Sequence, residues 1–155
     1  MTQGAEQSDR RAVDLSILSD PKNLAVVRAA AEKMARQEGF APNDVDGIML
    51  AIDEALANVM RHGYEGQKDC EIRIRLEATD DQKSGAGLIV TLRDQGKQVD
   101  PEVIKGRDLE DVRPGGLGVH IIQTVMDHVE YSCLEEGGMQ LRMVKYVRRP
   151  DEPSS

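Results

Sequence analysis

The sequence predicts an α+β fold, a two-layer sandwich in which helices cover one face of a mostly antiparallel sheet. Two observations support this fold class. The apolar pattern along the chain changes in the order strand, helix, helix, strand, strand, helix, strand, strand. In addition, strand-like runs within 70–94 and within 129–147 are separated by turns that contain glycine, as in β-hairpins.

The first part of the chain contains one predicted strand and two predicted helices. Residues 12–18 alternate between apolar and polar, which is the period of a strand. Asp20 can cap the helix that follows, Pro21 suits its first turn, and Gly39 closes it. The next helical pattern runs from about 43 to 62, and its broad apolar arc indicates that one side of this helix is buried.

The second part contains the two hairpins and a third helix. Residues 70–78 alternate as in a strand with one wet side, and a turn at 79–87 leads to a more continuously apolar strand at 88–94. Helical spacing returns over 117–129, just before the last two strands. Residues 95–116 show no periodicity, and loops of this length are often lids or binding loops.

The composition predicts one domain of ordinary size. The chain has 155 residues, 39% of them hydrophobic and 31% charged, which is enough to bury a single core. We expect the domain to span 12–148, with flexible tails at 1–11 and 149–155. Because the chain has no Trp and one Phe, its core is expected to consist of Val, Ile, Leu, Met and Ala.

Charge and cysteine content limit the classes of function. The net charge of -8 makes direct nucleic-acid binding a poor expectation, because neutralising phosphates requires clustered Lys and Arg. Cys70 and Cys133 form no CxxC motif and lie in strand-like runs, so we expect buried thiols and no zinc or redox site. The polar N-terminus and the lack of a bilayer-spanning run predict a cytoplasmic protein without membrane association.

A polar stripe runs along the edge of the second predicted helix. Glu54, Asn58 and His62 follow one another at four-residue spacing, and the small residues Gly47 and Ala51 lie between them on the helical wheel. Such a stripe leaves room for a ligand against the helix. The alternative is a solvated helix flank, in which His62 merely caps the last turn.

Two further polar clusters follow. Asp94 ends an apolar strand with Gly96 two residues later, which can direct a carboxylate into a cleft, although the same residues also suit a simple Asp-x-Gly turn. Gly115, Gly116 and Gly118 precede the third helix, where exposed N–H groups favour phosphate. A flexible connection is the alternative interpretation of these glycines.

In this order, the three clusters describe an ATP pocket. They provide a metal ligand, a carboxylate that reads the base, and a cradle for phosphates. The chain has neither a Walker A sequence nor a kinase glycine-rich loop followed by a strand lysine, which excludes the two commoner nucleotide-binding motifs.

The motifs resemble those of the GHKL (Bergerat-fold) ATPase domain over most of the chain. "DEALANVMRHGY" is similar to its N box, "DQGKQVDP" to its G1 box and "GGLGVHII" to its G2 box. Within this superfamily the short domain, the "EALANVMRHGY" form of the N box and the run "PGGLGVHIIQTVMDHVEY" resemble most the anti-sigma-factor serine kinases of bacteria.

This resemblance assigns roles to individual residues. It implies that Glu54 is the general base, that Asn58 binds the nucleotide through Mg²⁺, and that Asp94 with Gly96 reads the adenine amino group. It also implies phosphate binding by a run at the start of the third helix, namely Gly115, Gly116, Leu117, Gly118 and Val119. Many superfamily members have a further glycine at the position of Gln98, so nucleotide affinity or lid motion is expected to differ here.

The resemblance implies an ATP- and Mg²⁺-dependent serine/threonine protein kinase that acts as an anti-sigma factor. Its substrate would be a STAS-domain anti-anti-sigma protein, and its other partner a sigma factor whose availability it controls by partner switching. Homodimerisation is implied as well.

Other functions are compatible with parts of the sequence. One is a nucleotide-dependent module that sequesters a regulator with little turnover. A histidine-kinase fragment would need a dimerisation helix pair with a phosphoacceptor His, and a gyrase-like or mismatch-repair ATPase would need a second domain with a lysine. The last alternative is an acidic α+β domain whose glycines only form turns.

Overall fold

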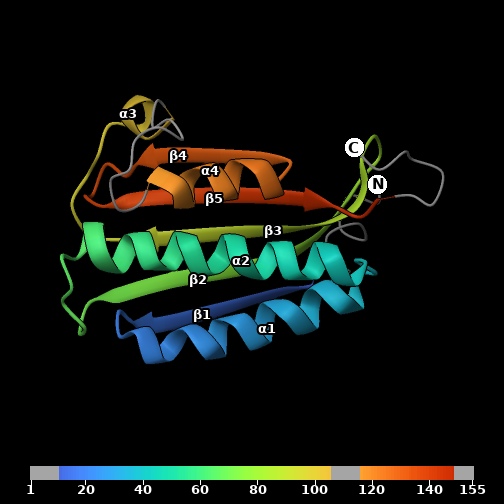
Figure 1. Cartoon of the computed structure of the whole chain (residues 1–155), viewed down its shortest axis with the longest axis horizontal. Helices are drawn as coiled ribbons and strands as arrows, with labels where there is room; N and C mark the ends of the chain where they lie inside the picture. Colours follow the sequence, from blue (N-terminus) through green and yellow to red (C-terminus); the bar gives the residue numbers. More distant parts are fainter. Residues whose placement is uncertain (1–10, 106–115, 149–155) are drawn as a thin grey trace, which may run out of the picture.

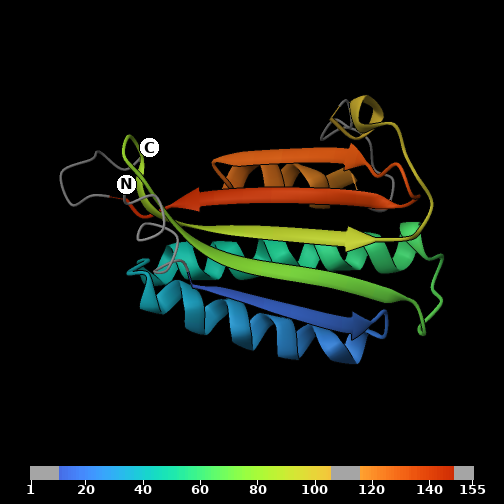
Figure 2. The same cartoon turned by 180° about the vertical axis from the view of Figure 1, so that it is seen from behind.

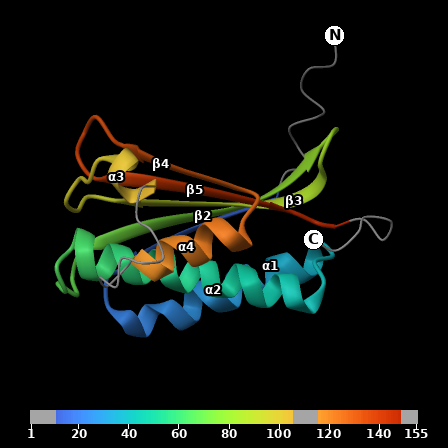
Figure 3. The same ribbon diagram turned by 45° about the horizontal axis from the view of Figure 1, so that its top comes forward.

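The computed structural model describes residues 11–105 and 116–148 as two layers, a five-stranded sheet and the helices that cover one of its faces (Figures 1 and 3). The strands are β1 (Ala12–Leu18), β2 (Glu71–Asp81), β3 (Gly85–Asp94), β4 (His128–Cys133) and β5 (Met139–Tyr146). They lie in the order β1-β2-β3-β5-β4, and every neighbouring pair is antiparallel. The predicted α+β sandwich is therefore confirmed.

The helical layer contains three longer helices. These are α1 (Leu24–Gln37), α2 (Pro42–Asn58) and α4 (Gly116–Val125). Three short elements complete the described chain, the 3-10 turn η1 (Pro21–Asn23), the π-helical turn η2 (Val59–Gly63) and α3 (Pro101–Lys105). Seen from behind, the opposite face of the sheet is not covered by any helix of the described residues (Figure 2).

Three sequence predictions are wrong in their boundaries. The turn predicted at 79–87 is short, because the polar residues 79–81 pair across the hairpin with the small residues 85–87. The third helix ends at Val125 and not at 129, because the N–H of Asp127 donates to Val144 and the chain joins the sheet. The segment 95–116 contains the short helix α3.

The core lies between the sheet and α2. Its members come from the predicted apolar arc of α2, from α1 and from the inner face of the sheet, with Phe40 and Tyr64 as the buried aromatic residues. The largest fully buried side chains are Ile48, Ile52, Leu56, Ile72, Ile74, Leu76, Leu88, Leu92, Ile122 and Met143. This confirms a core built mainly from aliphatic residues.

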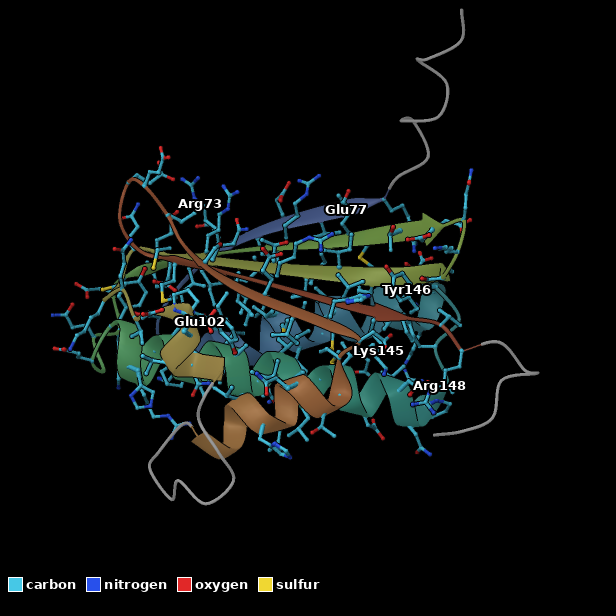
Figure 4. All side chains as sticks on the ribbon, turned by 90° about the horizontal axis from the view of Figure 1, so that it is seen from above. Arg73, Glu77, Glu102, Lys145, Tyr146 and Arg148 are labelled. Carbon is cyan, nitrogen blue, oxygen red and sulfur yellow. The ribbon has the colours of Figure 1, made fainter. Side chains whose placement is uncertain are left out.

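The small residues of α2 make room for a helix, not for a ligand. An ideal Cβ at Gly47 would lie 3.1 Å from Cγ1 of Val125, near the end of α4, and Ala51 is fully buried. The prediction that the space beside these residues is a ligand site is therefore wrong for this part of the helix. A side chain of the sheet also binds the end of α4: Nζ of the buried Lys145 in β5 donates to the carbonyl of Val125 at 2.7 Å (Figure 4).

The cysteines and the chain ends differ from expectation. Cys70 is only half-buried and Cys133 is exposed, because Cys133 is the last residue of an edge strand.

The predicted tails lie outside the described residues except for Arg11, whose carbonyl accepts from the N–H of Ala78 and whose guanidinium pairs with Glu38. No helix among the described residues is long and apolar enough to span a membrane.

Candidate functional site

The predicted site residues that the structure describes gather at one end of the molecule. The C-terminal ends of α2 and β3 meet the start of α4 there, close to α3 (Figure 1). A cavity opens between these elements, and Asn58, Asp94 and Val119 line it. Much of the remaining wall is apolar, with Val59, Leu92, Val99, Ile104, Met139 and Leu141. An apolar cavity with a few polar groups is typical of a small-molecule site.

Asn58 is the last residue of α2, and its amide oxygen is unpaired. Oδ1 is buried and has no hydrogen-bond partner among the described residues. A buried acceptor without a partner costs free energy, so such an atom in a cavity wall indicates a ligand. Glu54 and Asn58 are both half-buried, which argues against a solvated flank, whereas His62 is exposed.

Glu54 lies one turn earlier on α2, against the beginning of α4. An ideal Cβ at Gly118 would lie 2.5 Å from its Oε2 atom, so only glycine at this position leaves the carboxylate undisturbed. Gly118 and Val119 are buried. Gly116 and Leu117 are the first residues of α4, while Gly115 lies outside the described residues.

The end of α2 widens into the π-helical turn η2, a feature that sequence periodicity did not reveal. π turns within helices are rare and frequently occur at functional sites. The carbonyl of Gly63 at its end accepts from the N–H of Lys97 at 2.9 Å, and an ideal Cβ at Gly96 would lie 2.5 Å from that carbonyl oxygen. Glycine at position 96 is therefore required for close packing of this turn against the loop after β3.

Asp94 lies at the end of β3 and is held there by backbone hydrogen bonds. Its side chain is nearly buried, with 8% exposure, and Oδ1 accepts from the N–H of Gly96 at 2.8 Å. The predicted Asp-x-Gly turn is therefore present, but the carboxylate also lines the cavity. Burial raises the pKa of Asp94, and this rise is partly offset by hydrogen bonds from the backbone N–H groups of Gly96 and Met139.

Tyr64 supports the loop that follows Asp94, a role that the sequence did not reveal. Its hydroxyl accepts from the N–H of Gln95 at 2.7 Å and donates to the carbonyl of Glu71. Burial is the main reason that its pKa is raised. An aromatic residue after the predicted helix gave no signal of this role, because its partner Gln95 lies 31 residues further along the chain.

The turn between β4 and β5 is a second missed component. Gly138 has φ of +85°, and an ideal Cβ there would lie 1.9 Å from the backbone oxygen of Asp94. Gln98 in turn reaches this turn with its side chain. Lys97 adds a cationic side chain to the cavity wall. The glycine pair in "EEGG" was recognisable as a turn but not as a neighbour of Asp94.

Substituting Gly138 tests the close approach of this turn. We expect Gly138→Ala to lower the free energy of unfolding by about 3 kcal/mol or more, because the left-handed backbone is strained and the backbone of Asp94 must also move. Gly137→Ala is the matched control, since Gly137 has φ of +100° but open space around it, and should cost about 1–2 kcal/mol. Urea unfolding of both variants measures the difference, and equal costs would contradict the close approach.

This antiparallel sheet with helices on one face, and a cavity between α2 and the end of β3, defines a class of nucleotide-binding domains. The sequence model of the histidine kinase-like ATPase domain matches residues 17–145. The chain belongs to this family, whose fold implies ATP binding.

Relatives with assigned functions include serine-protein kinases named RsbW. The protein from Listeria innocua is 29% identical over 143 residues, covering 87% of both chains. The protein from Bacillus velezensis is 26% identical, covering 87% of this chain and 85% of the relative. The chain is thus related at low identity to RsbW-type kinases.

Two solved structures share the fold. One contains the RsbU and RsbW domains of a Mycobacterium tuberculosis protein, with a TM-score of 0.62 and 15% identity, covering 94% of this chain and 35% of that chain. The other is the SiaB–SiaC complex from Pseudomonas aeruginosa, with a TM-score of 0.62 and 14% identity, covering 85% of this chain and 88% of that chain.

Proposed function

We propose that this protein is an ATP-dependent serine/threonine kinase that acts as an anti-sigma factor and phosphorylates a STAS-domain anti-anti-sigma protein. The observation that carries the proposal is the unpaired, buried Oδ1 of Asn58, a residue that lines the same cavity as Asp94. Kinship with the RsbW serine-protein kinases supports the choice of reaction. The structural likeness to a two-protein complex supports a protein partner.

The residues present fit ATP and Mg²⁺. A carboxamide oxygen is a suitable ligand for this hard cation, which commonly keeps waters and phosphate oxygens as its other ligands. In the described part of the chain no three His, Cys, Asp or Glu residues form a metal cluster, so the cation would be held jointly by Asn58 and the phosphates. When bound, Mg²⁺ neutralises phosphate charge.

The remaining residues would orient the reactants. Asp94 would accept a hydrogen bond from the adenine amino group, and the backbone of Gly116 and Gly118 would approach the phosphates. Glu54 would accept the proton of the incoming serine or threonine hydroxyl. Positioning and charge neutralisation would then account for most of the rate enhancement.

The direct test is transfer of labelled γ-phosphate to purified STAS-domain proteins of the source organism. We expect transfer by the wild type, and a loss of about a hundredfold or more in Asn58→Ala, whose ATP binding should no longer respond to Mg²⁺. Asn43→Ala, an exposed site at the other end of α2, is the matched control. Tight ATP binding without transfer to any such protein would favour the sequestering module instead.

A further inference from the structure

Gln98 connects the loop after Asp94 to the turn between β4 and β5. Its Nε2 atom lies 2.9 Å from the carbonyl oxygen of Leu134 and 2.9 Å from that of Gly138. Because both partners are backbone carbonyls, which only accept hydrogen bonds, the amide NH₂ group must face them. One side chain therefore bridges the two ends of the turn.

Backbone contacts extend this connection. The N–H of Leu134 donates to the carbonyl of Gly138 at 3.0 Å, and the N–H of Gly137 donates to the carbonyl of Leu134 at 3.1 Å. The N–H of Val99, the residue after Gln98, donates to Sδ of Met139 at 3.3 Å. The loop and the turn thus form one hydrogen-bonded unit, which we call the Gln98 clamp (Gln98, Val99 and 134–139).

The Gln98 clamp is hydrogen-bonded to the carboxylate of Asp94. The N–H of Met139 donates to this carboxylate, as does the N–H of Gly96. The backbone of Gly138 is packed directly on the backbone of Asp94, where even one added carbon would overlap. The turn that Gln98 holds thus provides one of the two N–H donors that fix the orientation of the carboxylate.

We propose that Gln98 is a positioning residue that sets the preference of this site for adenine over guanine nucleotides, an inference that rests on the proposed function. Adenine presents an amino donor where guanine presents the O6 acceptor. A fixed carboxylate accepts from the first and repels the second, so discrimination depends on how well Asp94 is held. Through its two hydrogen bonds to this turn, Gln98 therefore helps to fix the carboxylate.

The first arm of the test uses the nucleotide-free protein. In Gln98→Glu the amide donor is replaced by a carboxylate that faces two carbonyls, so the clamp should open. We expect faster hydrogen exchange at the amides of Leu134, Gly137 and Met139 in this variant. Gln82→Glu, an exposed site in the β2–β3 turn, makes the same chemical change and should leave those amides as in the wild type.

The second arm measures affinities for ATP and GTP by competition with a fluorescent nucleotide. We expect Gln98→Glu to bind ATP roughly tenfold more weakly while its GTP affinity stays within about twofold, so that the ATP-to-GTP ratio falls. A purely structural defect would weaken both nucleotides alike. Gln82→Glu should keep the wild-type ratio.

The two arms separate three questions: whether the Gln98 clamp exists, whether it affects base selection, and whether the protein binds nucleotides at all. Unchanged exchange in Gln98→Glu would overturn the clamp, and faster exchange with an unchanged ATP-to-GTP ratio would overturn its role in base selection. If the wild type binds neither nucleotide, the proposed function fails, while the exchange arm still decides whether the clamp exists.

Discussion

Replacing Glu54 with Gln is expected to slow phosphate transfer by a factor of about a hundred or more and to leave ATP affinity within about twofold. A positioned general base contributes about 10²–10⁴-fold to proton transfer, and Gln has nearly the same shape but cannot accept the proton. Glu54 does not belong to the cavity wall that contains Asn58 and Asp94. Its loss should therefore act on the rate of the reaction and not on binding.

The measurement is the rate of STAS-protein phosphorylation, together with an ATP titration of the same variant. Asp46→Asn is the matched control, because Asp46 is an exposed carboxylate on the same helix, eight residues before Glu54. It should behave as the wild type in both assays. Full transfer by Glu54→Gln would remove Glu54 from the role of base, and loss of ATP binding would move it to the binding site.

The contact between Glu54 and Gly118 determines where the Glu54 carboxylate lies relative to α4. The carboxylate rests against the start of α4, where a Cβ at Gly118 would lie 2.5 Å from Oε2 and displace it. The proposed base Glu54 and the proposed phosphate-binding run at the start of α4 are thus packed on each other, so their relative position depends on how α2 and α4 pack. That packing is close, since Gly47 of α2 accommodates Val125 of α4.

Periodicity was enough to predict the fold because each element buries one face. The alternation of Ile72, Ile74 and Leu76 fixed both the strand and its inner side, and these residues are almost completely buried. The apolar arc of α2 was correct for the same reason. The ends of elements were predicted less well, because hydrogen bonds such as Asp127 to Val144 decide them and leave no periodic signal.

The site was only partly predictable for a related reason. Asn58 and Asp94 belong to motifs with local spacing, and both line the cavity. Tyr64, Gln98 and Gly138 act on Asp94 or its loop through contacts that span roughly 30 to 45 residues along the chain. No local pattern reports such contacts, and the tertiary structure is needed to see them.

Asp94→Asn is expected to lower ATP affinity by about a hundredfold. If the Asn oxygen keeps the hydrogen bond from Gly96, the new NH₂ group faces the adenine amino group, and two donors then oppose each other. The same NH₂ group can donate to O6 of guanine, so the ATP-to-GTP ratio should fall further than in Gln98→Glu. Competition titrations measure both, with Asp80→Asn, an exposed site near the end of β2, as the control. Wild-type ATP affinity in Asp94→Asn would exclude Asp94 from base reading.

The same variant isolates the pH dependence that burial of Asp94 creates. Burial raises its pKa above the usual value of 3.8, so between these two pKa values the folded, nucleotide-free protein holds a proton that the unfolded chain has released. The free energy of unfolding therefore decreases as pH rises through this window, and this loss should be absent from Asp94→Asn. Denaturant unfolding of both proteins from below pH 3.8 to neutral pH should show the wild type losing stability relative to the variant. A difference that does not change with pH would mean that the carboxylate is well solvated.

ATP affinity of the wild type should change in the opposite direction and strengthen as pH rises through the raised pKa of Asp94, because only the ionised carboxylate is a full acceptor for the base. The pH range in which ATP is expected to bind best is thus the range in which the burial of Asp94 lowers the free energy of unfolding of the nucleotide-free protein.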